Sequence, residues 1–183
     1  MTTALRVALA TDIPMLDALI RRSGLGLSAP FYTPAQAAAV TEHVFGVDSQ
    51  LISDQTYFMI ERSGTVVACG GWSRRRTLFG GDQTKHGADP LLDPRTEPAR
   101  IRAFFVDPAC ARQGLGRQLL SACIAAAEAA GFQALELAAT LPGVPLYRAC
   151  GFHAVESMHL NLPGPVEVPL VRMRRDLCAD AHV

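Results

Sequence analysis

The chain has 183 residues, of which 49% are hydrophobic and 19% are charged, and its 17 basic residues balance its 17 acidic residues. This length and composition predict a single globular domain over residues 1–183 and exclude a disordered chain. The absence of net charge gives no general case for nucleic-acid binding, and without a run of about 18 apolar residues no membrane span is expected.

Two helices are predicted near the start of the chain. Residues 4–9 suit a short strand, and Asp12 can cap a helix that runs from residue 13 to about residue 24. We expect a loop over residues 23–32. The next stretch, "TPAQ", has a Thr cap, a Pro at the first helical position and a Gln three residues after the cap. It predicts a second helix over residues 34–45.

A hairpin is predicted next, with strands over residues 56–61 and 65–72 around the turn "RSG". Residues 77–99 are rich in Gly, Pro and Asp and are long for a structureless connection, so we interpret them as a functional flap or a mobile insertion. Residues 100–106, "RIRAFFV", are apolar apart from two arginines and predict a central strand that is buried on both faces. The Asp-Pro pair at residues 107–108 ends this strand.

Helices and strands alternate in the second half of the chain until two final strands. We expect a helix over residues 117–131, a strand over 134–140, a short helix over 143–152 and two final strands over 153–162 and 168–177. This order of elements predicts an α/β or α+β sheet with helices packed on its faces.

Two glycines, Gly114 and Gly116, lie where the central strand gives way to a helix. Glycines in such a turn free backbone N–H groups to point at a ligand, and the helix N-terminus adds about half a positive charge, so the turn favours phosphate. Arg112 and Arg117 can add charge. Three interpretations compete: a tight connection alone, a dinucleotide site, and a pyrophosphate-bearing cofactor held by backbone amides. The dinucleotide site lacks its third glycine, because Leu stands at that position.

The stretches "RAFFVDPACARQGLGRQLL" and "LELAATLPGVPLYRACGF" together resemble the GNAT acetyltransferase superfamily. Its pattern is a strand, then Gln/Arg-x-x-Gly-x-Gly/Ala at a helix start, and later Tyr-x-x-x-Gly-Phe. The matching residues are Gly114, Gly116, Tyr147, Gly151 and Phe152, while Ala111 occupies the first position of the pattern. The resemblance extends over nearly the whole chain in its element order. It implies a mixed, mostly antiparallel central sheet of about six to seven strands with helices on both faces.

The resemblance implies acetyl-CoA as the co-substrate, and no metal. The amides of the glycine turn would hold its pyrophosphate, and the edge of the central strand would pair with the pantetheine amides as an added strand does. The residues implied are Phe104, Phe105, Val106, Arg112, Gln113, Gly114, Leu115, Gly116 and Arg117. The thioester would lie where "RAFFV" and "LELAA" diverge.

The implied activity is acetyl transfer to a primary amine, which requires an oxyanion donor and a proton for the departing thiolate. Tyr147 is the candidate general acid, because a phenol with a pKa near 10 can protonate a thiolate of similar basicity. The alternative role for Tyr147 is core packing. A backbone N–H between Phe104 and Val106 is the expected oxyanion donor. No general base is identified among the candidates Glu97, Glu136, His153 and His159.

The acceptor is expected to be a small-molecule or peptide amine, and a homodimer is compatible with the sequence. The loop over residues 23–33 and the turn over residues 162–167 would border the acceptor opening. Phe31 and Tyr32 make the loop apolar, and only Glu167 adds a nearby negative charge, so we predict a modestly charged acceptor with an apolar body. The alternatives to an enzyme are a non-catalytic acyl-CoA-binding sensor module and a nucleotide-binding regulator.

Two groups of arginines call for separate interpretations. Arg102 lies inside an apolar strand, where an unpaired charge is costly, and we expect a salt bridge to Glu136 in the next strand. "SRRRT", residues 73–77, ends a strand that runs antiparallel to "RIRAFFV" and therefore lies at the end remote from the glycine turn. We expect it to be a solvated or partner-facing run of charge.

The cysteines are scattered, at Cys69, Cys110, Cys123, Cys150 and Cys178, and no two form a Cys-x-x-Cys pair. This spacing favours reduced thiols over zinc ligands or disulfides. The first residues lack the charged start and apolar stretch of a signal peptide, so a cytoplasmic location is expected.

Overall fold

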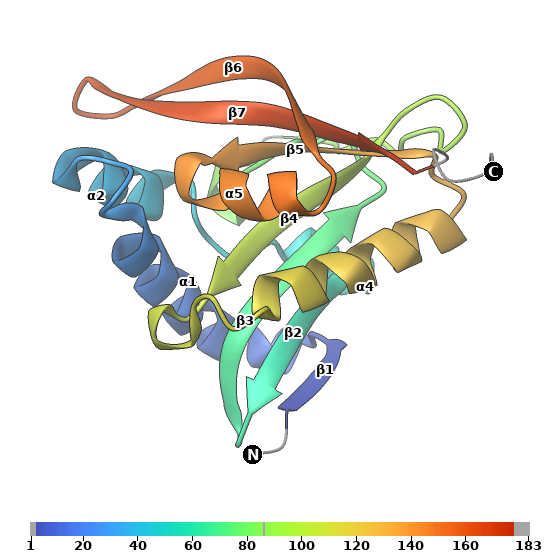
Figure 1. The fold of residues 1–183 in the computed structure, drawn as a ribbon, viewed down its shortest axis with the longest axis horizontal. Coiled ribbons are helices and arrows are strands. Elements are labelled where there is room, and N and C mark those ends of the chain that lie inside the picture. The colour runs from blue at the N-terminus through green and yellow to red at the C-terminus, as the bar shows by residue number, and fades with distance from the viewer. Residues whose placement is uncertain (1–2, 86, 178–183) are drawn as a thin grey trace.

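A computed structural model describes residues 3–85 and 87–177 and contains one seven-stranded sheet with the strand order β1-β2-β3-β4-β5-β7-β6 (Figure 1). The strands are β1 (Thr3–Val7), β2 (Tyr57–Arg62), β3 (Thr65–Ser73), β4 (Ala99–Val106), β5 (Ala134–Thr140), β6 (His153–Leu162) and β7 (Val166–Asp176). The helices are α1 (Ile13–Ser28), α2 (Pro34–His43), α3 (Ser49–Ser53), α4 (Leu115–Ala129) and α5 (Val144–Ala149). No helix in the described part of the chain is long and apolar enough to cross a membrane.

All neighbouring strands are antiparallel except β4 and β5, which confirms the predicted mixed, mostly antiparallel sheet. Successive side chains of a strand point to opposite faces of the sheet, and helices cover the apolar side chains on both faces. Leu115 and Leu119 of α4 pack with Ile60 on one face. On the other face Leu16 and Leu19 of α1 pack with side chains that include Met59 of β2. Figure 1 shows α4 crossing the sheet while α1 and α2 lie at its left.

The strands β4 and β5 pair only at their beginnings. The parallel register joins Ala99 with Leu135 and Arg100 with Glu136 and then stops, and Figure 1 shows the two strands diverging toward their carboxyl ends. A β-bulge lies just beyond this point, where Ala103 takes a left-handed φ of 53°. The divergence that the family resemblance implied is therefore present.

The elements with strong local signals form as predicted. In the capping box of α2, the Thr33 side chain accepts from the Gln36 N–H, and the Gln36 side chain accepts from the Thr33 N–H. The β2–β3 hairpin turns through Ser63 and Gly64, whose φ angles of 50° and 79° suit a tight hairpin turn. The helices over residues 115–129 and 144–149 and the two final strands also lie where they were expected.

The loop predicted over residues 23–32 was largely wrong, because α1 continues to Ser28. Its two glycines lie inside the helix at points of close approach. A Cβ atom on Gly24 would lie 2.7 Å from Thr41 Oγ1, and one on Gly26 would lie 2.5 Å from Pro108 Cγ. The close packing of neighbouring segments therefore explains why glycine occupies these two positions. Helix propensity alone predicts that the helix ends there.

Two further features of the N-terminal half differ from the prediction. The Asp12 side chain does not cap α1; it accepts from the Leu9 N–H and pairs with Arg6, which lowers the pKa of the Asp12 carboxyl. Helix α3 was not predicted. Asp48 caps it by accepting from the backbone N–H groups of residues 50 and 51.

The predicted salt bridge between Arg102 and Glu136 was wrong. In the parallel register Arg100 stands opposite Glu136, and Glu136 binds Arg100 and Arg172. Arg102 lies two residues farther along β4, and its Nη1 is 2.8 Å from Asp48 Oδ2. The side chains of both Arg102 and Asp48 are almost completely buried. The register of β4 and β5 places Arg100 opposite Glu136. Arg102 therefore pairs with Asp48, the N-cap of the unpredicted helix α3.

The segment over residues 77–98 is fastened to the body of the protein at several described positions. The Gly80 carbonyl accepts from Arg102 Nη2 at 2.6 Å, the Gly81 N–H donates to the Val44 carbonyl, and Lys85 contacts Asp48. These contacts argue against the interpretation as a mobile insertion, and a functional flap stays a prediction.

The arginine run before this segment lies at the end of β3 remote from the glycine turn, as expected, because Ser73 pairs with Arg100 at the start of β4. Arg75 pairs with Asp54 at 2.7 Å and Arg76 with Glu97 at 3.4 Å. The prediction of a solvated or partner-facing run was therefore wrong for Arg75, whose side chain is largely covered. Arg76 has a partner inside the protein, but its side chain stays 62% exposed, as the prediction expects.

We expect Arg102→Leu to lower the free energy of unfolding by about 3 kcal/mol, because it removes one of the two cationic side chains that contact the buried Asp48 carboxylate in the described residues. Asp48→Asn removes the charge but keeps a good helix cap. Combined with Arg102→Leu, it should cost clearly less than the sum of the two single changes. Urea unfolding curves measure both effects. Arg102→Leu with Glu136→Gln is the control pair and should be additive. Additivity in the Arg102/Asp48 pair would contradict the assignment.

Candidate functional site

The turn between β4 and α4 is shaped by its backbone. Asp107 begins it by accepting from the Ala109 N–H at 3.0 Å. Arg112 and Gly114 then take left-handed φ angles of 64° and 83°, and Gly114 is the N-cap of α4 without any side-chain cap. A Cβ atom on Gly114 would meet nothing within 4 Å. Gly114 therefore serves the backbone conformation and leaves open space above the helix start.

Gly116 has a different role. A Cβ atom there would lie 2.9 Å from Cδ2 of Leu146 on α5. This glycine therefore lets α5 pack closely against the first turn of α4, a role that sequence reasoning did not consider. Leu115 between the two glycines is buried, with its side chain packed into the core. Only its backbone can face a ligand.

Six consecutive N–H groups, those of residues 112–117, have no hydrogen-bond acceptor within the part of the chain that the structure describes. The run is bounded by the Ala111 N–H, which donates to the Pro108 carbonyl, and by the Gln118 N–H, which donates to the Gly114 carbonyl. Unused donors at a helix N-terminus attract anions, because they add to the positive end of the helix dipole. We call residues 112–117 the amide cradle.

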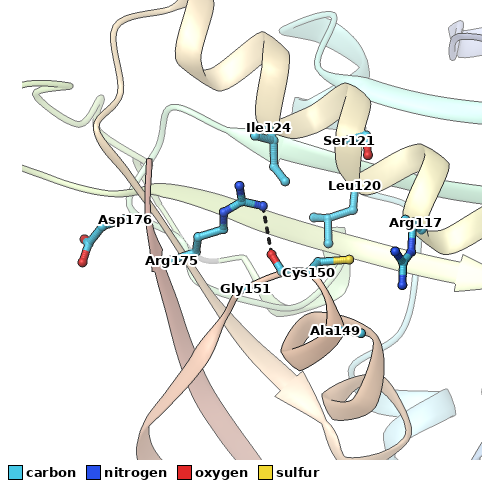
Figure 2. Close-up of a pocket in the computed structure, with 9 residues that line it drawn as sticks. All are labelled: Arg117, Leu120, Ser121, Ile124, Ala149, Cys150, Gly151, Arg175 and Asp176. Atoms are coloured by element: carbon cyan, nitrogen blue, oxygen red, sulfur yellow. Dashed lines mark hydrogen bonds between the residues drawn. The ribbon is translucent and has the colours of Figure 1, made fainter. Parts of the chain in front are cut away.

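Cationic side chains surround the amide cradle. Arg112 and Arg117 are exposed, and neither has a carboxylate partner in the described ranges, 3–85 and 87–177. Arg117 also lines a groove of about 500 Å³ between α4 and the region where α5 meets β7 (Figure 2). The other lining residues are Leu120, Ser121, Ile124, Ala149, Cys150, Gly151, Arg175 and Asp176. Arg175 donates to the Cys150 carbonyl at 2.9 Å across this groove. The groove could therefore take a ligand that extends from the cradle.

The predicted strand residues Phe104, Phe105 and Val106 face different surroundings. The Phe104 ring packs edge-on against Tyr147, with centroids 6.1 Å apart, and the Phe105 ring packs against Phe45 on the opposite face. The Val106 N–H donates to Ser23 Oγ at 3.2 Å. Because the Asp107 N–H turns toward β3, the alternation along the strand turns the Phe104 N–H toward β5, the side on which β4 is unpaired. Sequence reasoning missed Ser23, since it placed this residue in a loop.

Tyr147 lies on α5 with its ring inside an aromatic group. It packs edge-on against Phe104 and against Phe152, whose ring centroid is 5.8 Å away. Within the described residues no hydrogen-bond partner engages its hydroxyl. Burial, with smaller contributions from Cys123 and Cys150, raises the pKa of Tyr147 well above the usual value. The hydroxyl is therefore protonated at neutral pH and free to donate.

The two candidate acceptor residues differ in exposure. Phe31 is 45% exposed, whereas Tyr32 is 5% exposed. The Tyr32 hydroxyl donates to the Pro169 carbonyl at 2.8 Å and accepts from the Leu141 N–H at 2.9 Å. Tyr32 thus ties the α1–α2 connection to β7 and to the end of β5. Around it lies an apolar cluster that includes Val40, Val44, Phe79, Val168 and Leu170.

The candidate general bases mostly have partners of their own. Glu136 is buried against Arg100 and Arg172, and Glu97 accepts from the Asp93 N–H at 2.8 Å. His159 lies 2.8 Å from Glu167 at the surface of the β6–β7 hairpin. His153 begins β6 and is exposed. No group of three or more His, Cys, Asp or Glu side chains that could hold a metal ion occurs in the described residues.

The sequence model of the acetyltransferase (GNAT) family matches residues 27–152. No curated protein matches the chain significantly. Several solved structures share the fold. A GCN5-related N-acetyltransferase from Rhodopseudomonas palustris has a TM-score of 0.71 at 18% identity, with 97% of each chain covered. YncA from Salmonella typhimurium, a putative acetyltransferase solved with acetyl-CoA, has a TM-score of 0.66 at 17% identity, with 100% of this chain and 97% of that chain covered. PaiA N-acetyltransferase from Thermoplasma acidophilum, solved with coenzyme A, has a TM-score of 0.64 at 12% identity, with 96% and 99% covered.

Proposed function

Because the chain belongs to the GNAT acetyltransferase family, we propose that it transfers the acetyl group of acetyl-CoA directly to a primary amine, with Tyr147 as the general acid. The single observation that carries the cofactor part of this proposal is the amide cradle, with its six unengaged N–H groups and the open space above Gly114. A diphosphate needs several donors that approach closely, and this turn offers them without a competing side chain. The solved YncA and PaiA structures support the proposal, since they contain acetyl-CoA and coenzyme A.

Different residues between α4 and β4 would bind different parts of the cofactor. The amide cradle binds the pyrophosphate, with Arg112 and Arg117 adding positive charge. The unpaired side of β4 at Phe104–Val106 offers backbone groups to the pantetheine arm. The Phe104 N–H is the proposed oxyanion donor, because the Val106 N–H already donates to Ser23.

Tyr147 would protonate the departing thiolate. Its hydroxyl has no competing partner in the described residues, and its ring packs against that of Phe104, whose backbone N–H is the proposed oxyanion donor. A tyrosine is protonated at neutral pH even at its ordinary pKa, so the proton is available. Burial raises the pKa of Tyr147 and makes it a weaker acid, so the transfer depends on a strongly basic thiolate that develops close by. A non-catalytic acyl-CoA sensor would need the cradle but no proton donor, so the rate of a Tyr147 variant would distinguish the two.

The acceptor would approach from the side of the α1–α2 connection and the β6–β7 hairpin. The side chains packed beneath this region are apolar, and the Glu167 carboxylate lies 2.8 Å from His159. We therefore propose a modestly charged amine with an apolar body, small-molecule or peptide. Phe31 is the exposed candidate for contact with it. Tyr32 would act indirectly by holding the connection in place.

Acetyl-CoA should raise the melting temperature of the protein by mass action, and NADH should not. Gly114→Val should abolish this shift, because its side chain would enter the open space of the cradle. Gly164→Val is a matched control, since Gly164 has a φ of 82° and equally open surroundings in the β6–β7 hairpin. It should cost similar stability but keep the shift. Normal acetyl-CoA binding by a folded Gly114→Val variant would overturn the proposal that the amide cradle binds the pyrophosphate.

Tyr147→Phe removes one hydroxyl that has no partner in the described residues, so stability and coenzyme A affinity should change little. The single-turnover rate should fall roughly 10- to 1,000-fold, because the thiolate loses its proton donor. Tyr32→Phe is the control: it removes a hydroxyl with two hydrogen bonds and should reduce stability more than rate. An unchanged rate in Tyr147→Phe would leave Tyr147 with core packing alone.

Phe31→Ala should raise the acceptor KM and spare the KM for acetyl-CoA, because Phe31 is exposed beside the proposed acceptor opening and away from the cradle. Initial rates with the best substrate from a panel of polyamines, aminoglycosides, amino acids and peptide N-termini provide the measurement. Leu25→Ala, which removes a similarly exposed side chain from α1, should leave both constants unchanged. Selective use of spermine or spermidine at low KM would refute the charge argument.

A further inference from the structure

An arginine from a distant strand reaches the turn that forms the amide cradle. Arg62 is the last residue of β2, and its Nη1 donates to Gln113 Oε1 at 2.8 Å and lies 3.8 Å from Cys110 Sγ. Gln113 belongs to the cradle, and Cys110 lies just before it. The Arg62 guanidinium is therefore held by the side chain of a cradle residue, although Arg62 itself lies at the end of β2, just before the β2–β3 turn.

The backbone beneath Arg62 is well fixed. Arg62 pairs with Thr3 of β1 on one side and with Thr65 of β3 on the other. The hairpin turn follows at once, with both of its central residues in the left-handed region. Because the backbone of Arg62 is fixed and its guanidinium is hydrogen-bonded, the side chain loses little further conformational entropy when a ligand binds.

The charge of Arg62 is not neutralised inside the described ranges of the protein. The neighbouring carboxylate, Glu61, accepts from Arg6 at 2.7 Å. No carboxylate lies within ion-pair distance of Arg62 in the part of the chain that the structure describes. Its partner Gln113 is a neutral amide, which can orient a guanidinium but cannot cancel its charge. This contrasts with Arg102, which is also held in place but is paired with Asp48.

We propose that Arg62, positioned by Gln113, is a cofactor-binding residue that supplies a fixed positive charge to the diphosphate held in the amide cradle. The inference rests on the proposed function and adds to it a residue from outside the β4–α4 turn. Arg112 and Arg117 also carry charge, but they are exposed and have no side-chain hydrogen bond among the described residues, so they must be ordered when the ligand binds. Position 111, which directly follows Cys110, contributes only a methyl group.

The test is the Kd for coenzyme A, measured by calorimetry at several salt concentrations. Arg62→Gln should raise the Kd about tenfold and should flatten its dependence on salt, because a charge-assisted contact is lost. Arg62→Lys keeps the charge and should lose clearly less affinity. Arg76→Gln removes an equal charge at the remote end of the sheet and should leave the Kd unchanged. Circular dichroism checks the fold of each variant.

Two further variants test whether Arg62 binds the diphosphate through its charge or only stabilises the conformation of the β4–α4 turn. Gln113→Ala should weaken coenzyme A binding, and the double variant with Arg62→Gln should be no weaker than Arg62→Gln alone, because Gln113 acts through Arg62. Ala111→Arg placed in the Arg62→Gln background should restore affinity, since it returns a cation to the same turn. Inhibition by pantetheine, which has no phosphate, should be the same in the wild type and in Arg62→Gln.

The outcomes distinguish this inference from the function on which it rests. A wild-type protein that does not bind coenzyme A would overturn the proposed function. Tight wild-type binding with an unchanged Kd in Arg62→Gln would overturn the role of Arg62 alone. Equal losses in Arg62→Gln and Arg62→Lys, or equal losses for coenzyme A and pantetheine, would also overturn it, since either shows support of the turn rather than recognition of phosphate.

Discussion

The site depends on the short parallel contact between β4 and β5. The two strands pair only through Ala99 and Arg100, and the bulge at Ala103 then turns β4 away. A non-glycine residue at a left-handed φ is strained, so the surroundings must hold it there. They do so from several elements. The Tyr57 hydroxyl lies 3.2 Å from the Ala103 carbonyl, Asp48 binds Arg102, and Gly70 leaves room for the Phe104 ring. The unpaired side of β4 exists because these contacts maintain the bulge.

The arginines divide according to whether they have carboxylate partners. Those that fasten the scaffold, such as Arg75, Arg100 and Arg102, have partners among the described residues. Those around the amide cradle, such as Arg62 and Arg117, have none there. A chain with no net charge can in this way present a positive region, because its carboxylates are used elsewhere. The electrostatic character of the site therefore follows from pairing and not from composition.

Sequence reasoning succeeded where the determinants were local. The capping box at Thr33 and the glycine turn at Gly114 are both short patterns whose residues lie close together in the chain. It failed where a distant contact decided the outcome. Gly24 and Gly26 do not end α1, because glycine serves there to make room for segments that pack against the helix. Arg102 binds the N-cap residue of a helix too short to be predicted. The contact between Arg62 and Gln113 was likewise missed, since it spans 51 positions and depends on the sheet register.

The position of Tyr147 shows how core packing and a chemical role can coincide in one side chain. Its ring contributes to the core beside Phe104 and Phe152, which fixes the direction of the hydroxyl at the cost of desolvating it. Desolvation disfavours the phenolate and so raises the pKa of Tyr147, which makes this residue a weaker acid and keeps its proton in place until an anion forms nearby. Core packing therefore holds the hydroxyl in place for the acid role but also weakens the acid, so proton transfer requires the thiolate to develop beside the hydroxyl.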